Sequence, residues 1–303
     1  LESTTKDISI APLFGDLPYE QQQAAIMPSR CGARRVVLAT PVAETSITIE
    51  GVRIVVDSGL HKVSRSQRTG ITSLSTERIS LDSAEQRAGR AARTAPGVCV
   101  RLWSTAEHAT LRPNREPEVL RSDLCQPLLE LAAWGVRDFE NFAWVTKPSA
   151  VQLSEAVRAL ESLGALNNER SITARGKVLA SLGTDPRIAS LCIESRRYGL
   201  ERTAAALIAV LEEKLPAHLT KHSADLTHIV EKLVSSRASS QVPQRIKEAA
   251  NSWYQRIRHI DSPKGAAPTK VAPGSELGLL LSVAFPERVA KRRADSKERY
   301  LMA

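Results

Sequence analysis

Residues 35–57, RVVLATPVAETSITIEGVRIVVD, decide the fold class. Two nearly continuous apolar runs rich in β-branched residues, 35–40 and 53–57, enclose a segment rich in hydroxyl groups. Such runs are typical of strands in a parallel sheet that is covered on both faces. Because parallel strands need a crossover, we expect residues 43–48 to make it as a short helix. The stretch therefore predicts an α/β domain.

The neighbouring sequence extends this pattern on both sides. Residues 8–11 predict a strand, and the Gln/Ala/Glu-rich segment 19–27 predicts a helix that begins after Pro18. A helix is expected over 83–93 and another strand over 97–103. Alternating Thr, Ile and Ser residues with Arg-Thr-Gly at 68–70 predict a β-hairpin within 61–80.

After Pro113 the sequence becomes mainly helical. Gly164 fits a left-handed residue at a helix end, followed by a short hairpin and another helix, which is the outline of a winged helix. Residues 262–274 have the composition of a linker, and an apolar run precedes a basic one within 276–303. Helices are expected over 119–133, 153–163, 174–182, 186–213, 225–237 and 244–260.

Composition narrows the class of protein. The 303 residues carry a net charge of +9 and have a pI of about 9.6, which favours a polyanionic partner. The longest apolar stretch, 204–211, is far shorter than the roughly 20 residues that span a bilayer, so no membrane partner is expected. Four widely spaced cysteines predict reduced thiols and a cytoplasmic location, and no residue set predicts a metal site.

The segment Gln86-Arg87-Ala88-Gly89-Arg90-Ala91-Ala92-Arg93 carries three arginines at three-residue intervals. On a helix they would form a cationic stripe, and small residues between them would let another backbone approach. A guanidinium binds phosphate bidentately and keeps its charge. The alternative is a solvated basic helix face.

The segment 39–52 places hydroxyl groups at the carboxyl end of a predicted strand, where open α/β sheets bind ligands. Hydroxyls and free N–H groups there suit phosphate oxygens. Helix capping by Thr45 or Ser46 explains the same residues equally well.

Together these segments resemble the second RecA-like domain of a superfamily 2 helicase of the DEAH/RHA group. Residues 13–18 with 21–23 resemble motif IV, 39–51 motif V and 86–93 motif VI. The resemblance implies a P-loop NTPase-type α/β fold followed by a mainly helical region. It divides the chain into a RecA-like domain that is incomplete at its N-terminus, a winged helix, a helical-bundle or ratchet domain, and the start of a region characteristic of one bacterial branch: 1–115, 116–182, 183–262 and 263–303.

The resemblance also implies roles at the nucleotide. Arg90 and Arg93 match the arginine fingers on the ATP phosphates, and Gln86 matches the residue that places the attacking water. Ser46 matches a sensor of nucleotide state and Glu50 a contact to the ribose. Gly89 is expected to lie against the nucleotide.

A second group of implied roles concerns nucleic acid. Gly15 and Thr40 match contacts to the phosphate backbone, which bind without sequence preference. The hairpin with Lys62, Arg65 and Arg68 resembles the element that separates strands or bends the track.

Three positions depart from the family pattern. Pro41 replaces an Asn in motif V, Ala92 replaces a Gly in motif VI, and Ile26 stands where relatives stack a Phe on the base. These changes bear on efficiency rather than on family membership.

Neither G-x-x-x-x-G-K-[ST] nor Asp-Glu-x-His occurs in the sequence. We therefore expect a fragment that does not hydrolyse ATP alone, whose ATP and Mg²⁺ are held mainly by the first RecA-like domain of a parent protein. Its predicted function is the C-terminal part of an ATP-dependent helicase acting on single-stranded RNA or other nucleic acid. The alternative is a non-catalytic winged-helix module that binds nucleic acid, with the α/β domain as a scaffold.

Overall fold

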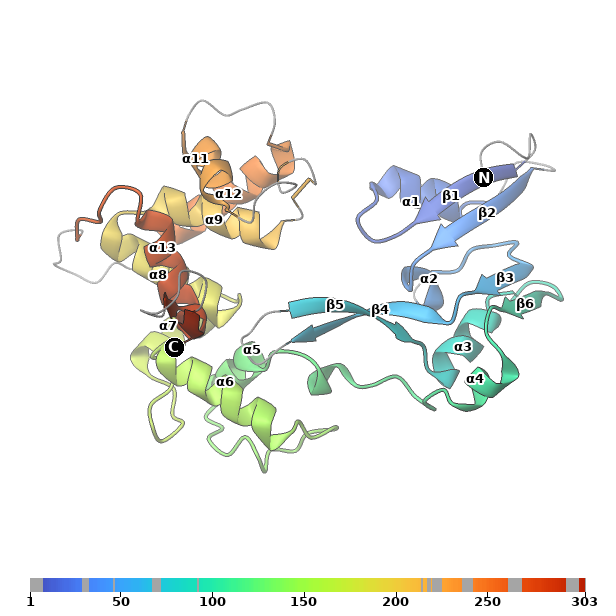
Figure 1. The fold of residues 1–303 in the computed structure, drawn as a ribbon, viewed down its shortest axis with the longest axis horizontal. Coiled ribbons are helices and arrows are strands. Elements are labelled where there is room, and N and C mark those ends of the chain that lie inside the picture. The colour runs from blue at the N-terminus through green and yellow to red at the C-terminus, as the bar shows by residue number, and fades with distance from the viewer. Residues whose placement is uncertain are drawn as a thin grey trace. The chain divides into compact units, whose positions relative to one another are not determined.

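The computed structural model divides the chain into two compact units (Figure 1). The first comprises residues 1–67 and 71–122, and the second comprises 68–70 and 123–303. The structure describes residues 8–28, 33–45, 47–66, 72–91, 93–213, 215–216, 219, 225–235, 242–260, 269–292 and 300–302.

The first unit is an α/β unit with parallel strands, as predicted. Strand β1 pairs in parallel with β2, with Ile8 opposite Arg34, and β3 pairs in parallel with β6, with Ile54 opposite Val98. The elements of this unit are β1 Ile8–Leu13, α1 Tyr19–Ile26, β2 Arg34–Ala39, α2 Val42–Thr45, β3 Ile54–Asp57, β4 Leu60–Ser66, β5 Thr72–Arg78, α3 Leu81–Ala88, β6 Val98–Arg101, α4 Thr105–Ala109 and the 3₁₀ turn η1 Glu118–Leu120.

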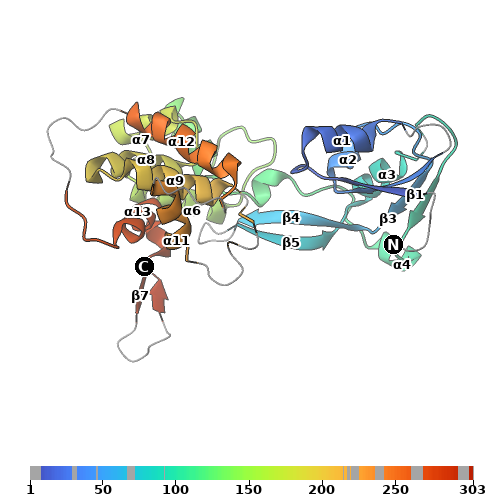
Figure 2. The same cartoon turned by 90° about the horizontal axis from the view of Figure 1, so that it is seen from above.

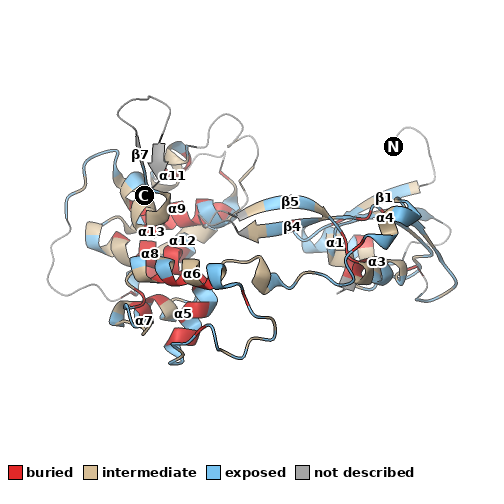
Figure 3. Ribbon diagram, turned by 60° about the horizontal axis from the view of Figure 1, so that its bottom comes forward, coloured by how far each residue is buried: buried red, intermediate tan, exposed pale blue. Residues whose placement is uncertain are grey.

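The expectation that both faces of the parallel strands are covered is wrong for the described residues. Leu38 on β2 is 53% exposed, and Ile54 and Val56 on β3 are 68% and 63% exposed. Val37 and Val55, on the opposite face of the same strands, are only partly exposed. Successive side chains of a strand alternate between faces, so one apolar face of these strands is more exposed than the other. Figure 3 shows buried residues mainly in the helices of the second unit.

The predicted hairpin is confirmed. Strands β4 and β5 pair antiparallel from Leu60 opposite Arg78 to Ser66 opposite Thr72. Figure 2 shows them as a long two-stranded ribbon.

Helix α3 is shorter than predicted, which removes two of the three arginines from it. After Ala88 the chain makes a tight turn, in which the Ala91 N–H donates to the Ala88 carbonyl at 3.0 Å. This turn packs on Gly97: a Cβ there would lie 2.0 Å from the Ala91 oxygen, and 2.7 Å from the Arg53 oxygen. The close packing against a glycine replaces the last turn of the predicted helix, so no continuous stripe forms.

The second unit is mainly helical. Its elements are α5 Cys125–Ala133, α6 Ala150–Ser162, α7 Ala174–Ser181, α8 Pro186–Tyr198, α9 Glu201–Glu212, α11 Thr227–Val234, α12 Gln244–Arg258, α13 Glu276–Ala284, the 3₁₀ turn η2 Pro286–Arg288, and the antiparallel pair β7 Ala290–Arg292 and β8 Tyr300–Met302.

Two predicted helices differ from the observed ones. The helix expected over 119–133 begins only at Cys125, whose N–H donates to Asp123 Oδ1 at 2.7 Å. The stretch 186–213 is divided by Gly199, which ends α8 with a φ of 67°. A side-chain acceptor and a left-handed glycine thus set these boundaries.

The helix, turn and helix expected for a winged helix are present. Gly164 has a φ of 67°, as predicted, and Leu166 forms an antiparallel bridge with Ile172. A Cβ on Gly176 of α7 would lie 2.2 Å from the Ala165 oxygen, so the helix packs directly on this hairpin. The division of the chain into four domains stays a prediction.

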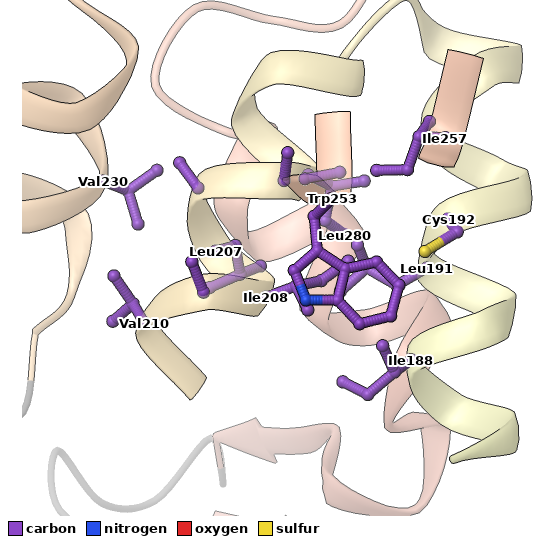
Figure 4. Close-up of a cluster of buried hydrophobic side chains, with 14 of the residues drawn as sticks. Ile188, Leu191, Cys192, Leu207, Ile208, Val210, Val230, Trp253, Ile257 and Leu280 are labelled. Atoms are coloured by element: carbon purple, nitrogen blue, oxygen red, sulfur yellow. The ribbon is translucent and has the colours of Figure 1, made fainter. Parts of the chain in front are cut away.

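A large apolar core of the second unit lies between α8, α9, α11, α12 and α13 (Figure 4). Leu207, Ile208 and Ile257 are 0% exposed. Trp253 donates its Nε1–H to Glu212 Oε2 at 2.8 Å, so its polar atom is satisfied beside the apolar cluster.

Replacement of Leu207 by Ala tests this core. We expect Leu207→Ala to lower the free energy of unfolding of the second unit by about 3 kcal/mol, because it leaves a cavity in packed apolar surroundings. Leu211→Ala, on the same helix at a site 39% exposed, should cost less than about 1.5 kcal/mol. Urea denaturation followed by circular dichroism measures both, and equal losses would contradict the assigned core.

Candidate functional site

The carboxylate of Glu44 is the centre of a buried ion network in the first unit. Helix α2 places Glu44 where it is only 3% exposed. Its Oε2 accepts from Arg87 Nε at 3.0 Å, and its Oε1 accepts from Ser83 Oγ at 2.8 Å and from Arg115 Nη2. Two guanidinium groups therefore compensate the loss of water around this charge.

Arg87 links this network to strand β3. Its Nη1 donates to Asp57 Oδ1 at 2.9 Å and to the Leu60 carbonyl at 3.3 Å. Asp57 is 3% exposed, and the Arg87 side chain is only 15% exposed. Arg87 thus bridges two buried carboxylates and is turned away from solvent.

Arg90 instead reaches α2 and the segment that follows it. Its Nη1 donates to the Ile47 carbonyl at 2.8 Å, and its Nη2 donates to the Glu44 carbonyl. Its Nε is buried and has no hydrogen-bond partner among the described residues. Burial and then the charge of Arg93 lower the pKa of Arg90 from its ordinary value. An arginine beside a second cation with an unused donor suits an incoming anion.

Arg93 lies beside Arg90 on the same segment. It is exposed, and its Nη1 donates to Thr48 Oγ1 at 2.5 Å. The two predicted finger residues thus converge on Ile47 and Thr48, within the hydroxyl-rich segment. A guanidinium has five N–H donors, so Arg93 keeps capacity for phosphate oxygens.

The remaining predicted nucleotide residues have different outcomes. Gln86, Gly89 and Glu50 are exposed. A Cβ on Gly89 would lie 3.4 Å from the Glu85 oxygen, an ordinary contact, so packing within the described chain does not require glycine there. Ser46, like Ala92, lies outside the described residues.

The structure brings Gly15 and Thr40 to the same end of paired strands. Leu13 lies opposite Ala39 in the parallel pair, and the Thr40 N–H donates to the Leu13 carbonyl at 3.0 Å. Both Gly15 and Thr40 are exposed just beyond these strand ends. This is the edge at which open α/β sheets bind ligands.

The hairpin residues separate into exposed and paired ones. Lys62 is exposed, and Arg68 lies outside the described residues. Arg65 donates to Glu77 through Nε at 2.6 Å and Nη2 at 3.0 Å, and to Glu116 at 2.9 Å. The Arg65 guanidinium and then the Ser75 hydroxyl lower the pKa of Glu77 to about 2.

Sequence reasoning missed Glu44, Asp57, Arg115 and Glu116. Arg115 meets Glu44 across 71 positions of the chain, and Arg87 meets Asp57 across 30. Neither pair has a local pattern that reveals it. The one sequence signal was that Asp57 directly follows an apolar run, because a charged residue at the end of a buried strand needs a partner.

The described residues contain no group of three or more His, Cys, Asp or Glu side chains that could hold a metal ion. Mg²⁺ prefers oxygen ligands, and the cationic pair Arg90 and Arg93 does not fit it. Nor does any helix in the described ranges combine the length and apolar character needed to cross a membrane.

Comparisons with known proteins identify relatives of this chain. Residues 1–95 match the family described as the helicase conserved C-terminal domain. The ATP-dependent RNA helicase HrpB of Escherichia coli is 37% identical over 303 residues, covering 98% of this chain and 34% of that protein. HrpA of the same organism is 36% identical over 213 residues, covering 68% of this chain and 16% of that protein.

A solved structure agrees with these sequence matches. The crystal structure of the Escherichia coli DEAH/RHA helicase HrpB has a TM-score of 0.79 to this chain at 36% identity, covering 99% of this chain and 35% of that one. The chain therefore spans about a third of the length of HrpB.

The structure predicts different costs for two arginines of the same motif. Arg87→Gln should lower the free energy of unfolding of the first unit by about 3 kcal/mol, because Glu44 and Asp57 lose a buried cation. Arg93→Gln, at an exposed site, should cost less than about 1 kcal/mol. Urea denaturation reports both, and similar losses would contradict the buried network.

The lowered pKa of Glu77 predicts acid sensitivity of the hairpin. A depressed pKa in the folded state gives stability that is present above the ordinary value of 4.5 and lost as pH falls towards about 2. The urea midpoint of the first unit should therefore drop between pH 5 and pH 3, and Glu77→Gln should reduce that drop. Glu20→Gln, which changes an exposed carboxylate of α1, serves as the control and should keep the wild-type pH dependence.

Proposed function

The chain belongs with the DEAH-box helicases as an HrpB-like C-terminal region, with a RecA-like unit followed by a helical region, and from this premise we propose its function. It supplies the second half of an ATP-driven motor that acts on single-stranded RNA. The catalytic centre forms between this chain and a first RecA-like domain.

The convergence of Arg90 and Arg93 on residues 47–48 carries this proposal. Two guanidinium groups at one place can neutralise the charge that develops on a transferred phosphoryl group. The positive charges of Arg90 and Arg93 lie close enough to interact, which supports an anionic ligand at this place. ATP is the substrate whose phosphates these arginines contact.

The other site residues take supporting roles under this proposal. Gln86 orients the attacking water, Glu50 contacts the ribose, Ser46 responds to the nucleotide state, and Gly89 lies against the nucleotide. Their exposure, where described, leaves Gln86, Gly89 and Glu50 accessible to a ligand.

A first RecA-like domain would supply what this sequence lacks. The phosphate cradle G-x-x-x-x-G-K-[ST] and the Mg²⁺-binding Asp-Glu-x-His are not in the chain. Mg²⁺ neutralises phosphate charge when it is bound. This chain contributes its arginines and its contacts to nucleic acid.

Exposed residues at the end of β1 and β2 support binding to RNA. Gly15 and Thr40 contact the phosphate backbone, and Lys62 adds a cation on the hairpin. The net charge of +9 favours such a partner. The winged helix of 116–182 and the helical bundle of 183–262 are further domains that we propose for binding RNA.

The thiols fit a reducing, cytoplasmic environment. Cys99, Cys125 and Cys192 are free. Burial raises the pKa of Cys192 to about 12, so it stays protonated and unreactive.

Replacement of Arg90 tests the proposed motor in a protein that joins this chain to a first RecA-like domain. Arg90→Ala should lower the rate of ATP hydrolysis by about 10³-fold, because the charge of the transition state loses its cation. Binding of single-stranded RNA should change less than about threefold, since backbone contacts lie elsewhere. A coupled ATPase assay and fluorescence anisotropy measure the two quantities.

Arg34→Ala, which changes an exposed arginine of β2 outside the three motifs, is the matched control and should leave hydrolysis unchanged. Full ATP hydrolysis in Arg90→Ala would refute the finger assignment. Absence of ATP hydrolysis in the unsubstituted protein would instead favour the non-catalytic nucleic-acid-binding alternative.

A further inference from the structure

Two consecutive residues, Arg115 and Glu116, lie between the candidate phosphate site and the hairpin. Arg115 Nη2 donates to Glu44 Oε1 and, at 3.0 Å, to Ser83 Oγ. Glu116 Oε2 accepts from Arg65 Nη2 at 2.9 Å. One short piece of chain therefore contacts both regions, and all of its contacts lie within the first unit.

Arg115 and Arg90 both donate hydrogen bonds to Glu44. Arg115 binds the side chain of Glu44, while Arg90 Nη2 donates to the main-chain carbonyl of Glu44. The main-chain N–H of Arg115 also donates to Asp82 Oδ2 at 3.3 Å. A shift of Arg90 towards a ligand therefore acts on a residue that Arg115 holds.

Glu116 contacts the hairpin through Arg65. Arg65 of β4 binds Glu77 of β5 bidentately and Glu116 through the shared Nη2. Arg121 adds a second link, since its Nη1 donates to the Ser64 carbonyl at 3.3 Å. The segment 115–121 is thus fastened along strand β4.

The spacing of the two residues makes transmission direct. Consecutive Cα atoms are about 3.8 Å apart across a rigid peptide bond, so a displacement of one residue moves the other. Glu44 is 3% exposed and also binds Arg87, so Arg115 is the second of two cations that compensate this buried charge. Separation of Arg115 from Glu44 would remove part of that compensation, which favours movement of the two residues together.

We propose that Arg115 and Glu116 are positioning residues that couple the arginine finger Arg90, through Glu44, to Arg65 of the hairpin. The sequence predicts that Arg65 contacts RNA. In this arrangement Arg65 is instead the residue of the hairpin to which the coupling is transmitted. The inference rests on the proposed motor function for its consequence, which is that nucleotide state sets the position of the hairpin. Contiguous packed ion pairs are the physical basis on which such coupling can travel.

The first test uses the 303-residue chain without nucleotide, so it does not depend on the motor function. Glu116→Gln removes the carboxylate that binds Arg65 and does not touch Glu44. If the residues are coupled, amide hydrogen exchange should become faster at Ala43 and Glu44 of α2, whose N–H groups donate to the Thr40 and Pro41 carbonyls, as well as in β4. Glu118→Gln is the matched control, two positions further on at an exposed site, and should leave both regions unchanged.

The second test uses the protein that joins this chain to a first RecA-like domain. Arg115→Gln and Glu116→Gln should each reduce the duplex unwound per ATP hydrolysed by about fivefold, the lower range of coupling between sites. ATP hydrolysis without RNA should stay within about twofold in Glu116→Gln. The double variant should lose no more than either single one, because both substitutions interrupt one connection.

A conservative variant distinguishes coupling between the two sites from a purely structural role of Arg115. Arg115→Lys keeps a cation for Glu44 and should restore most of the unwinding per ATP, which a loss of fold would not allow. Losses that add in the double variant would overturn the proposal, as would unchanged exchange at Ala43 and Glu44 in Glu116→Gln. If the unsubstituted protein neither hydrolyses ATP nor unwinds RNA, the motor function fails while the exchange result still decides the coupling.

Discussion

The buried carboxylate of Glu44 is the constraint on which the first unit depends. A charge that is 3% exposed needs cations, and Arg87 and Arg115 reach it from segments distant in sequence. Arg87 also meets Asp57, so the network fixes α2, β3 and α3 relative to one another. Because a buried charge without its partner is strongly destabilising, these elements hold one arrangement.

In the second unit the buried charged group is a cation that two carboxylates bind. Arg187 of α8 is 5% exposed; its Nη1 lies 3.2 Å from Asp123 Oδ2, and its Nε lies 2.7 Å from Glu287 Oε1. Asp123 precedes α5 and Glu287 lies in η2, so the two carboxylates are far apart in the sequence of the unit. Its large apolar core supplies stability, while the buried ion pairs specify which segments meet.

The tight turn after α3 gives three similar arginines different tasks. Arg87, still in the helix, is buried between carboxylates, whereas Arg90 and Arg93 lie beyond the helix end and reach residues 47–48. Arg87 thus holds Glu44 of α2 in place, and Arg90 and Arg93 bind residues 47–48, which follow this helix. A rigid support of this kind keeps candidate phosphate ligands in place before a ligand arrives, which reduces the cost of ordering them on binding.

Sequence by itself determined the parallel α/β unit, the hairpin, most helices and the motifs that hold Arg90 and Arg93, because periodicity, glycines and motif spacing are local properties. It missed the end of α3, which depends on Ala91 packing against Gly97. It also missed Glu44, Arg115 and Glu116 as a group, and it did not reveal that Glu77 and Glu116 bind Arg65, whose contact to nucleic acid stays a prediction. Only the tertiary structure decided these points, since pairs separated by 71 and 51 positions meet only after the chain has folded.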